Sequence, residues 1–212
     1  MRYDLALVVG AGAFGTSIAS VLANNFDKVV LKVRSEDNYE SLKKGENSIY
    51  LPGIKLPENI IPALSWEEVD SLSEKKCELV VSGLPTQGIK VFFSENHDRF
   101  ENYFKKGVPL VSLSKGIDPD TLELSDDSFF NLFPNHKELI TFLSGPSFAK
   151  EIMMEQITLV SLAGRSRRVL LNIAAMLEAP YFKVFSNCLS LSPGNPTITS
   201  DVIDALGINF LM

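Results

Sequence analysis

A glycine-rich turn between an apolar run and a helical pattern is the feature that most constrains how this chain can fold. Residues 5–9 are all apolar, and the spacing Gly10-x-Gly12-x-x-Gly15 follows directly. In this pattern the first glycine permits a tight turn, the second lets backbone N–H groups approach a pyrophosphate, and the third lets the next helix pack closely on the strand. The unpaired N–H groups and the positive dipole at the helix N-terminus also favour an anion. The segment therefore predicts a dinucleotide-binding turn.

The residues after this turn strengthen the interpretation, because glycines alone also mark ordinary structural turns. Residues 14–25 carry apolar side chains at near-helical spacing, and a β-branched run at residues 28–33 follows at the distance expected of a βαβ unit. The context favours dinucleotide binding over a purely structural turn.

Strand-like and helix-like segments alternate along the rest of the chain. We expect further strands at residues 78–82, 108–113, 139–143 and 157–163, and helices at residues 36–44, 66–72, 86–104 and 166–178. Residues 47–57 are expected to form an irregular loop. The alternation predicts an α/β fold of the Rossmann-like, doubly wound type, with a mainly parallel sheet and helices on both faces.

Four turns follow directly after expected strands. They are the turn after Val9, Leu84-Pro85, Ser114-Lys115-Gly116 and Gly145-Pro146-Ser147. Ligands of doubly wound sheets bind outside the carboxyl ends of the strands. We therefore expect these turns to lie together at one edge of the sheet.

The end of the second strand bears on the choice of cofactor. NAD-specific sites often place Asp or Glu there, bonded to the ribose 2′-hydroxyl, whereas this chain has Arg34. A guanidinium binds a phosphate bidentately, so Arg34 permits NADP alongside NAD. The alternative interpretation is a solvated charge at a strand end.

Two of the turns carry side chains suited to an anionic substrate. Lys115 places a cation just beyond a buried strand, where it would meet a phosphate, a substrate oxygen or the nicotinamide ribose. Pro146 suits the first turn of a helix, and Ser147 offers a hydroxyl where backbone N–H groups are free. Each feature alone is a weak signal, since a single lysine in such a place is usually a solvated surface residue.

Composition excludes several classes of function. A net charge of −6 over 212 residues argues against a large nucleic-acid-binding surface. Cys77 and Cys188 lack metal-type spacing, and Cys77 fits a small buried hydrophobe. His97 and His136 sit in polar segments, so we assign both to the surface and expect no metal site.

Without a bilayer-spanning run or a signal-peptide pattern, we expect no stable membrane insertion and a reducing, cytoplasmic location.

Five segments of the chain form an ordered set of motifs, namely residues 10–16, 47–53, 56–57, 114–117 and 145–149. Among them, the Asn-x-x-Tyr-Leu-Pro-Gly and Gly-Pro-Ser-Phe-Ala segments are far more specific than the glycine turn. Taken in order, these motifs resemble those of the NAD(P)-dependent glycerol-3-phosphate dehydrogenases of bacterial type, and the resemblance extends to residues 181–187.

This resemblance implies a reaction and a set of site residues. The reaction is the reversible reduction of dihydroxyacetone phosphate, a small-molecule phosphate, to sn-glycerol 3-phosphate, which supplies glycerophospholipid synthesis. The implied NAD- or NADP-binding residues are Gly10, Gly12, Ala13, Phe14, Gly15, Arg34, Lys115 and Ala149. The implied substrate-binding residues are Lys115, Gly145 and Ser147.

The sequence departs from the family after Asn187. Family members continue into a helical substrate domain that opens with a Gly-Gly-Ala-Leu-Lys-Asn-Val-type segment, whose lysine is the expected general acid and base. No lysine follows Lys183 here, so the catalytic residue is unknown. We expect residues 1–187 to form a dinucleotide-binding domain and residues 188–212 to form a divergent tail in place of the substrate domain. Turnover by this chain alone is then expected to be very weak or absent.

Two alternatives stay open. One is a non-catalytic dinucleotide-binding remnant or regulatory module, and the other is a different dehydrogenase with a similar cofactor domain, such as a ketopantoate- or hydroxyacid-type reductase. Apolar surface left uncovered would favour a homodimer or aggregation. Residues 202–212 fit either a segment that covers this surface or a frayed terminus.

Overall fold

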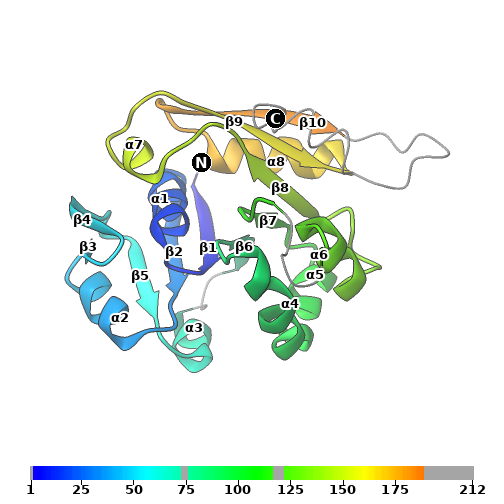
Figure 1. The fold of residues 1–212 in the computed structure, drawn as a ribbon, viewed down its shortest axis with the longest axis horizontal. Helices are drawn as coiled ribbons and strands as arrows, with labels where there is room; N and C mark the ends of the chain where they lie inside the picture. Colours follow the sequence, from blue (N-terminus) through cyan, green and yellow to red (C-terminus); the bar gives the residue numbers. More distant parts are fainter. Residues whose placement is uncertain (1, 73–75, 117–121, 189–212) are drawn as a thin grey trace.

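An eight-stranded sheet organises the part of the chain that the computed structural model describes, residues 2–72, 76–116 and 122–188 (Figure 1). The expectations for residues 189–212 lie outside the described residues. In spatial order the strands are β10 (Phe182–Cys188), β9 (Thr158–Gly164), β8 (Ile140–Ser144), β7 (Leu110–Ser112), β6 (Cys77–Ser82), β1 (Tyr3–Val9), β2 (Phe26–Lys32) and β5 (Ile60–Ala63).

The strand directions confirm the expected fold class. Every neighbouring pair from β5 to β8 is parallel, β9 runs antiparallel to β8, and β10 is parallel to β9. The helices between them are α1 (Ala13–Leu22), α2 (Glu36–Lys43), α3 (Trp66–Leu72), α4 (Thr86–Glu95), α5 (His97–Lys105), α6 (Ser125–Leu132), α7 (Ala149–Met153) and α8 (Arg167–Leu177).

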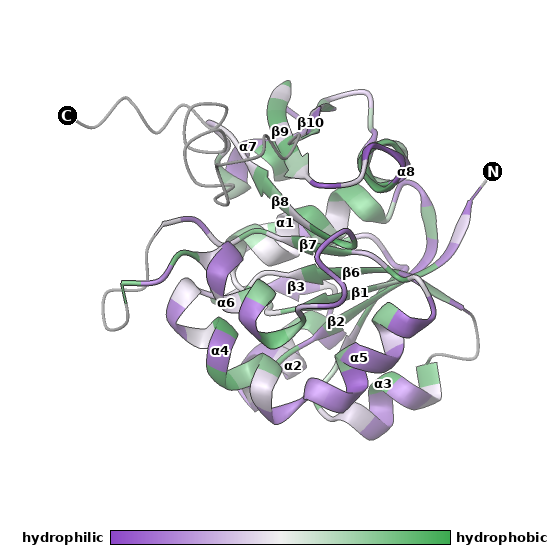
Figure 2. Ribbon diagram, turned by 90° about the vertical axis from the view of Figure 1, so that its right-hand side faces the viewer, coloured by the Kyte–Doolittle hydropathy of each residue, from purple (hydrophilic) through white to green (hydrophobic). Residues whose placement is uncertain are grey.

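Both faces of the sheet are covered, which explains why residues 5–9 of β1 are all apolar. Leu5 and Leu7 pack into one core with α3, α4, α5 and α6, whereas Ala6 and Val8 pack into a second core with α1 and α8. Successive side chains of a strand point to opposite faces, so a strand buried on both sides has no polar positions. Figure 2 shows α3 to α6 together on one side of the sheet and α8 on the other.

The expected elements differ from the structure in several places, and α6 and β10 were not predicted. Residues 86–104 form two helices rather than one, because the backbone leaves helical geometry at Asn96, whose amide donates to the Phe92 carbonyl at 2.8 Å. Residues 47–57 are not wholly irregular, since β3 (Glu46–Asn47) and β4 (Leu51–Lys55) form an antiparallel hairpin. Strand β5 was missed because it is short and contains Pro62, which is tolerated because β5 is an edge strand.

The surface assignment is wrong for His136 and holds for His97, whose side chain is 42% exposed, and the burial expected of Cys77 is confirmed. His136 is largely buried, its ring stacked on Phe104 and its Nε2 donating to Glu101 Oε1 at 3.1 Å. The His97 ring stacks on Phe133 with 4.9 Å between ring centroids. Cys77 is buried as expected. Among the residues described, no helix has the length and apolar character to cross a membrane, and no acidic, histidine or cysteine cluster suits a metal ion.

Candidate functional site

Two glycines of the turn after β1 are required by close packing. Gly10 has φ +99°, and a Cβ there would lie 2.8 Å from the Gly83 carbonyl oxygen. A Cβ on Gly15 would lie 2.1 Å from the Gly10 carbonyl oxygen, and one on Gly83 would lie 2.9 Å from the same atom. These three glycines therefore let α1 approach the ends of β1 and β6 closely. Sequence reasoning missed Gly83, although its place directly after an apolar strand was a usable signal.

Gly12 differs from the other two glycines of the motif. It is the N-cap of α1 with φ −69°, an ordinary backbone conformation, and a Cβ there would meet nothing within 4 Å. The cap has no side-chain hydrogen bond, and the first turn of α1 holds no acidic residue. Open space beside an uncapped helix N-terminus fits the pyrophosphate of a dinucleotide.

The site also contains two buried asparagines that sequence reasoning did not assign to it. Asn47 and Asn38 each donate from Nδ2 to the carbonyl oxygen of Ala11, both at 3.1 Å. Asn47 begins the Asn-x-x-Tyr-Leu-Pro-Gly segment, which the sequence identified only as a family marker. No sequence signal indicated that the fold buries Asn47 against the glycine turn.

A cavity of about 630 Å³ opens at the carboxyl ends of the central strands. Its walls come from the start of α1, from the segment after β6, from the segment after β7 and from the segment after β8. The expectation that these turns gather at one edge of the sheet is confirmed. The lining residues are Phe14, Gly83, Leu84, Pro85, Thr86, Gln87, Leu113, Ser114, Lys115 and Ser147.

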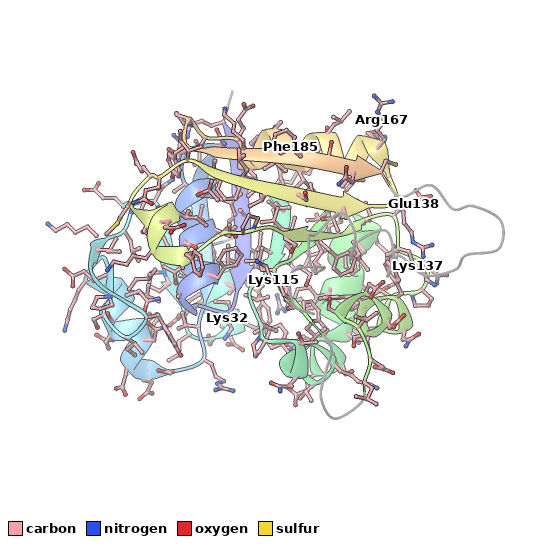
Figure 3. The ribbon with its side chains drawn as sticks, turned by 45° about the horizontal axis from the view of Figure 1, so that its top comes forward. Lys32, Lys115, Lys137, Glu138, Arg167 and Phe185 are labelled. Carbon is pink, nitrogen blue, oxygen red and sulfur yellow. The ribbon has the colours of Figure 1, made fainter. Side chains whose placement is uncertain are left out.

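Lys115 is the cation of this cavity. Its Nζ donates to the Gly145 carbonyl at 2.9 Å and lies 5.2 Å from the centre of the Phe14 ring. This bond brings the two predicted substrate-binding turns into contact, and Ser147 Oγ donates to the same carbonyl at 3.4 Å from within its own turn. Burial of its ammonium group lowers the pKa of Lys115. Figure 3 shows Lys115 away from the β10 and α8 side of the molecule, where Phe185 and Arg167 lie.

Other predicted site residues lie apart from the cavity lining. Arg34 is exposed just after β2, beside Ser35, which caps α2 by accepting a hydrogen bond from the Asn38 N–H. Ala149 begins α7. Lys32, also labelled in Figure 3, donates to the carbonyls of Val33 and Leu64. The ligand contacts assigned to the site residues stay predictions.

Comparison with known proteins identifies the family. Residues 6–169 match the model described as the N-terminus of NAD-dependent glycerol-3-phosphate dehydrogenase. The chain belongs to this family. The resemblance drawn from the sequence motifs is therefore confirmed, and the family is NAD(P)-dependent.

Curated relatives agree with the family match. The chain is 31% identical over 181 residues to a glycerol-3-phosphate dehydrogenase [NAD(P)+] of Leptospira biflexa, covering 84% of this chain and 52% of the relative. It is 34% identical over 178 residues to that of Ehrlichia chaffeensis, with the same two coverages. The chain thus spans about half the length of the curated relatives it matches.

A solved structure from Dunaliella salina supports the fold. This glycerol-3-phosphate dehydrogenase superposes with a TM-score of 0.72 at 21% identity, covering 88% of this chain and 34% of the other. Identity at this level shows that the two chains share an architecture.

Proposed function

We propose that this chain binds NADH or NADPH and forms the cofactor half of a dehydrogenase that interconverts dihydroxyacetone phosphate and sn-glycerol 3-phosphate. One observation carries the proposal. The start of α1, the Lys115 turn and the Ser147 turn, which are far apart in the sequence, line one cavity at the carboxyl edge of a doubly wound sheet. Ligands of such sheets bind at this edge.

Each part of the proposed site, inside the cavity and around it, has a task in this proposal. Gly12 and the N-terminus of α1 receive the pyrophosphate, and Ala13, Phe14 and Ala149 contact the cofactor, while Arg34 binds the 2′-phosphate of NADPH. A bound dihydronicotinamide supplies the hydride for carbonyl reduction. Lys115 contacts both the cofactor and the substrate, and its charge attracts the substrate phosphate or the oxygen on which negative charge develops.

Gly145 and Ser147 complete the substrate side of the proposed site. The Gly145 carbonyl holds the Lys115 ammonium, and the Ser147 hydroxyl lies beside it. Together they orient the substrate so that its carbonyl carbon faces the cofactor, because positioning alone supplies several kcal/mol of the barrier.

The wider biological setting is part of the same proposal. Residues 1–187 serve as the dinucleotide-binding domain and residues 188–212 as a divergent tail. The reaction takes place in the cytoplasm, and its product enters glycerophospholipid synthesis. Association into a homodimer covers apolar surface that is exposed in the single chain, including Leu159 and Phe185.

The decisive experiment is a calorimetric titration with NADH and with NADPH, each with and without dihydroxyacetone phosphate. We expect saturable binding of the reduced cofactor, tightened by the substrate, and weak turnover in a parallel assay of cofactor oxidation. Lys115→Met should abolish the tightening, whereas Lys105→Met, which removes a surface lysine at the end of α5, should not.

The outcomes separate the candidate functions. If the chain binds the cofactor with the same affinity in the presence and absence of dihydroxyacetone phosphate, the result would support the non-catalytic module instead. Tightening by ketopantoate or a hydroxyacid, but not by dihydroxyacetone phosphate, would support the other reductases. No binding of either cofactor at millimolar concentration would overturn the proposal.

A further inference from the structure

Asn47 makes three hydrogen bonds, two of which connect the β3–β4 hairpin to the glycine turn and to α1. The residue is fully buried. Its Nδ2 donates to the Ala11 carbonyl at 3.1 Å and to Thr16 Oγ1 at 2.7 Å, and its Oδ1 accepts from the Tyr50 N–H at 3.3 Å. The hairpin thus contacts both the turn and the first part of α1.

The chemistry of the partners fixes the orientation of this amide. A backbone N–H only donates and a backbone carbonyl only accepts, so Oδ1 must face Tyr50 and Nδ2 must face Ala11. Asn38 donates to the same Ala11 carbonyl from α2. Its buried Oδ1 has no partner among the described residues, so Asn38 is the less completely bonded of the two.

Holding the Ala11 carbonyl also sets the direction of the next N–H group. The described chain contains no cis peptide bond, and in a trans peptide the C=O and the following N–H point in opposite directions. With the Ala11 carbonyl directed at Asn38 and Asn47, the Gly12 N–H points away from α2 and the hairpin. Within the described part of the chain it donates to no protein group, and the space beside Gly12 is open.

We propose that Asn47, assisted by Asn38, is a positioning residue that presents the Gly12 N–H to the pyrophosphate of the bound dinucleotide. The assignment rests on the proposed function. It gives a physical role to the first residue of the Asn-x-x-Tyr-Leu-Pro-Gly segment. Without these amides, the Ala11–Gly12 peptide is free to rotate, and a flipped peptide would aim a carbonyl oxygen at the phosphates.

The hairpin is itself held in place, which makes it a suitable support for Asn47. Ser41 of α2 donates from Oγ to the Glu46 carbonyl at 3.0 Å and accepts from the Ser48 N–H at 2.9 Å. The Leu56 N–H donates to the Gly45 carbonyl at 2.8 Å and closes the base of the hairpin. The residues on both sides of Asn47 are therefore anchored to α2.

The chain offers a matched control for the test. Asn59 also uses one Nδ2 to bond two acceptors, the carbonyls of Ala23 and Phe26, at 3.0 and 2.9 Å. These acceptors lie at the C-cap of α1 and at the first residue of β2 rather than at the glycine turn. Arg2 also donates to the carbonyls of Ala23 and Phe26, so they keep a donor in Asn59→Ala. In the same way, the Ala11 carbonyl keeps Asn38 as a donor in Asn47→Ala.

The experiment compares Asn47→Ala, Asn38→Ala and Asn59→Ala by calorimetric titration with NADH and with ADP-ribose. ADP-ribose carries the adenosine, the pyrophosphate and the second ribose but lacks the nicotinamide, so it keeps the contact with the glycine turn and removes the contacts of the nicotinamide ring. We expect Asn47→Ala to raise both dissociation constants about tenfold or more, the size expected when buried hydrogen bonds are lost. Asn38→Ala should cause a smaller increase, and Asn59→Ala should cause less than about a twofold change.

A second measurement needs no ligand. In ¹H–¹⁵N spectra of the free protein, Asn47→Ala should shift the Gly12 N–H resonance and speed its exchange with solvent, whereas Asn59→Ala should leave it unchanged. Equal effects of Asn47→Ala and Asn59→Ala on binding and on this resonance would overturn the proposal. Should Asn47→Ala not fold, the same comparison between Asn38→Ala and Asn59→Ala decides it. Failure of the wild type to bind either ligand would instead reject the proposed function.

Discussion

Replacing the glycines of the turn one at a time should separate folding from binding. At Gly15 an added methyl group would lie 2.1 Å from the Gly10 carbonyl oxygen, closer than the 3.0 Å below which something must shift. Both groups belong to the backbone, so no side chain can rotate away. Helix α1 and the end of β1 must separate by about 0.9 Å for Gly15→Ala to be accommodated.

The expected changes in the free energy of unfolding therefore differ between Gly15→Ala and Gly12→Ala. Overpacking typically costs 1–3 kcal/mol, and a clash between two backbone segments belongs at the upper end, so we expect Gly15→Ala to lose about 3 kcal/mol of stability. At Gly12 the conformation is ordinary and the space is open. Alanine stabilises the folded protein by about 0.4–1 kcal/mol because it reduces the conformational entropy of the unfolded chain. It is also a poorer N-cap than glycine, which costs a similar amount, so the free energy of unfolding should change by less than about 0.5 kcal/mol.

Urea unfolding followed by the fluorescence of Trp66, the single tryptophan, measures the first effect. With a urea m-value of about 2 kcal/mol/M, Gly15→Ala should lower the midpoint by about 1.5 M, and Gly12→Ala should leave it nearly unchanged. Titration with NADH measures the second effect, and Gly12→Ala should weaken binding about tenfold or more because the methyl group occupies the space for the pyrophosphate. An unchanged midpoint for Gly15→Ala, or wild-type affinity for Gly12→Ala, would refute the reasoning.

Three further predictions concern single side chains. Arg34→Ala should weaken NADPH binding about tenfold and leave NADH binding unchanged, measured by titration with both cofactors; equal losses would contradict the 2′-phosphate contact. Because burial lowers the pKa of Lys115, its ammonium loses its proton below the usual 10.5 of lysine. Tightening by dihydroxyacetone phosphate should therefore decline as pH rises toward that value, whereas Lys115→Arg should remove this decline. Burial raises the pKa of Cys77 to about 12, so a thiol reagent at pH 8 should modify exposed Cys188 in the folded protein and Cys77 only after unfolding in urea.

The fold was largely predictable because its signals are local. The apolar run before Gly10 and the alternation of strand and helix patterns are enough to predict a doubly wound sheet. The errors arose where a tertiary contact decides the outcome. The break between α4 and α5 depends on the side-chain amide of Asn96. Strand β5 depends on its position at the edge of the sheet, where the missing N–H of Pro62 costs no hydrogen bond between strands.

The site was predictable in position and less so in detail. The sequence could place Phe14, Lys115 and Ser147 at the carboxyl edge of the sheet, because each follows a recognisable strand. It could not reveal that Gly10 and Gly15 meet Gly83, or that Asn47 reaches the turn. Those contacts join segments separated by dozens of residues, and no local pattern records them.

The hydrogen bonds around Gly145 explain how this cavity keeps a usable positive charge. The Gly145 carbonyl accepts from both Lys115 and Ser147 and so fixes the ammonium at the cavity wall. A carbonyl is neutral, so it orients the cation without cancelling its charge, as a carboxylate partner would. A phosphate entering the cavity therefore meets a lysine that is already oriented and that pairs with no acid among the described residues, and the entropy of ordering that side chain has been lost on folding rather than on binding. In this way the backbone of one turn prepares the side chain of another for an anionic ligand.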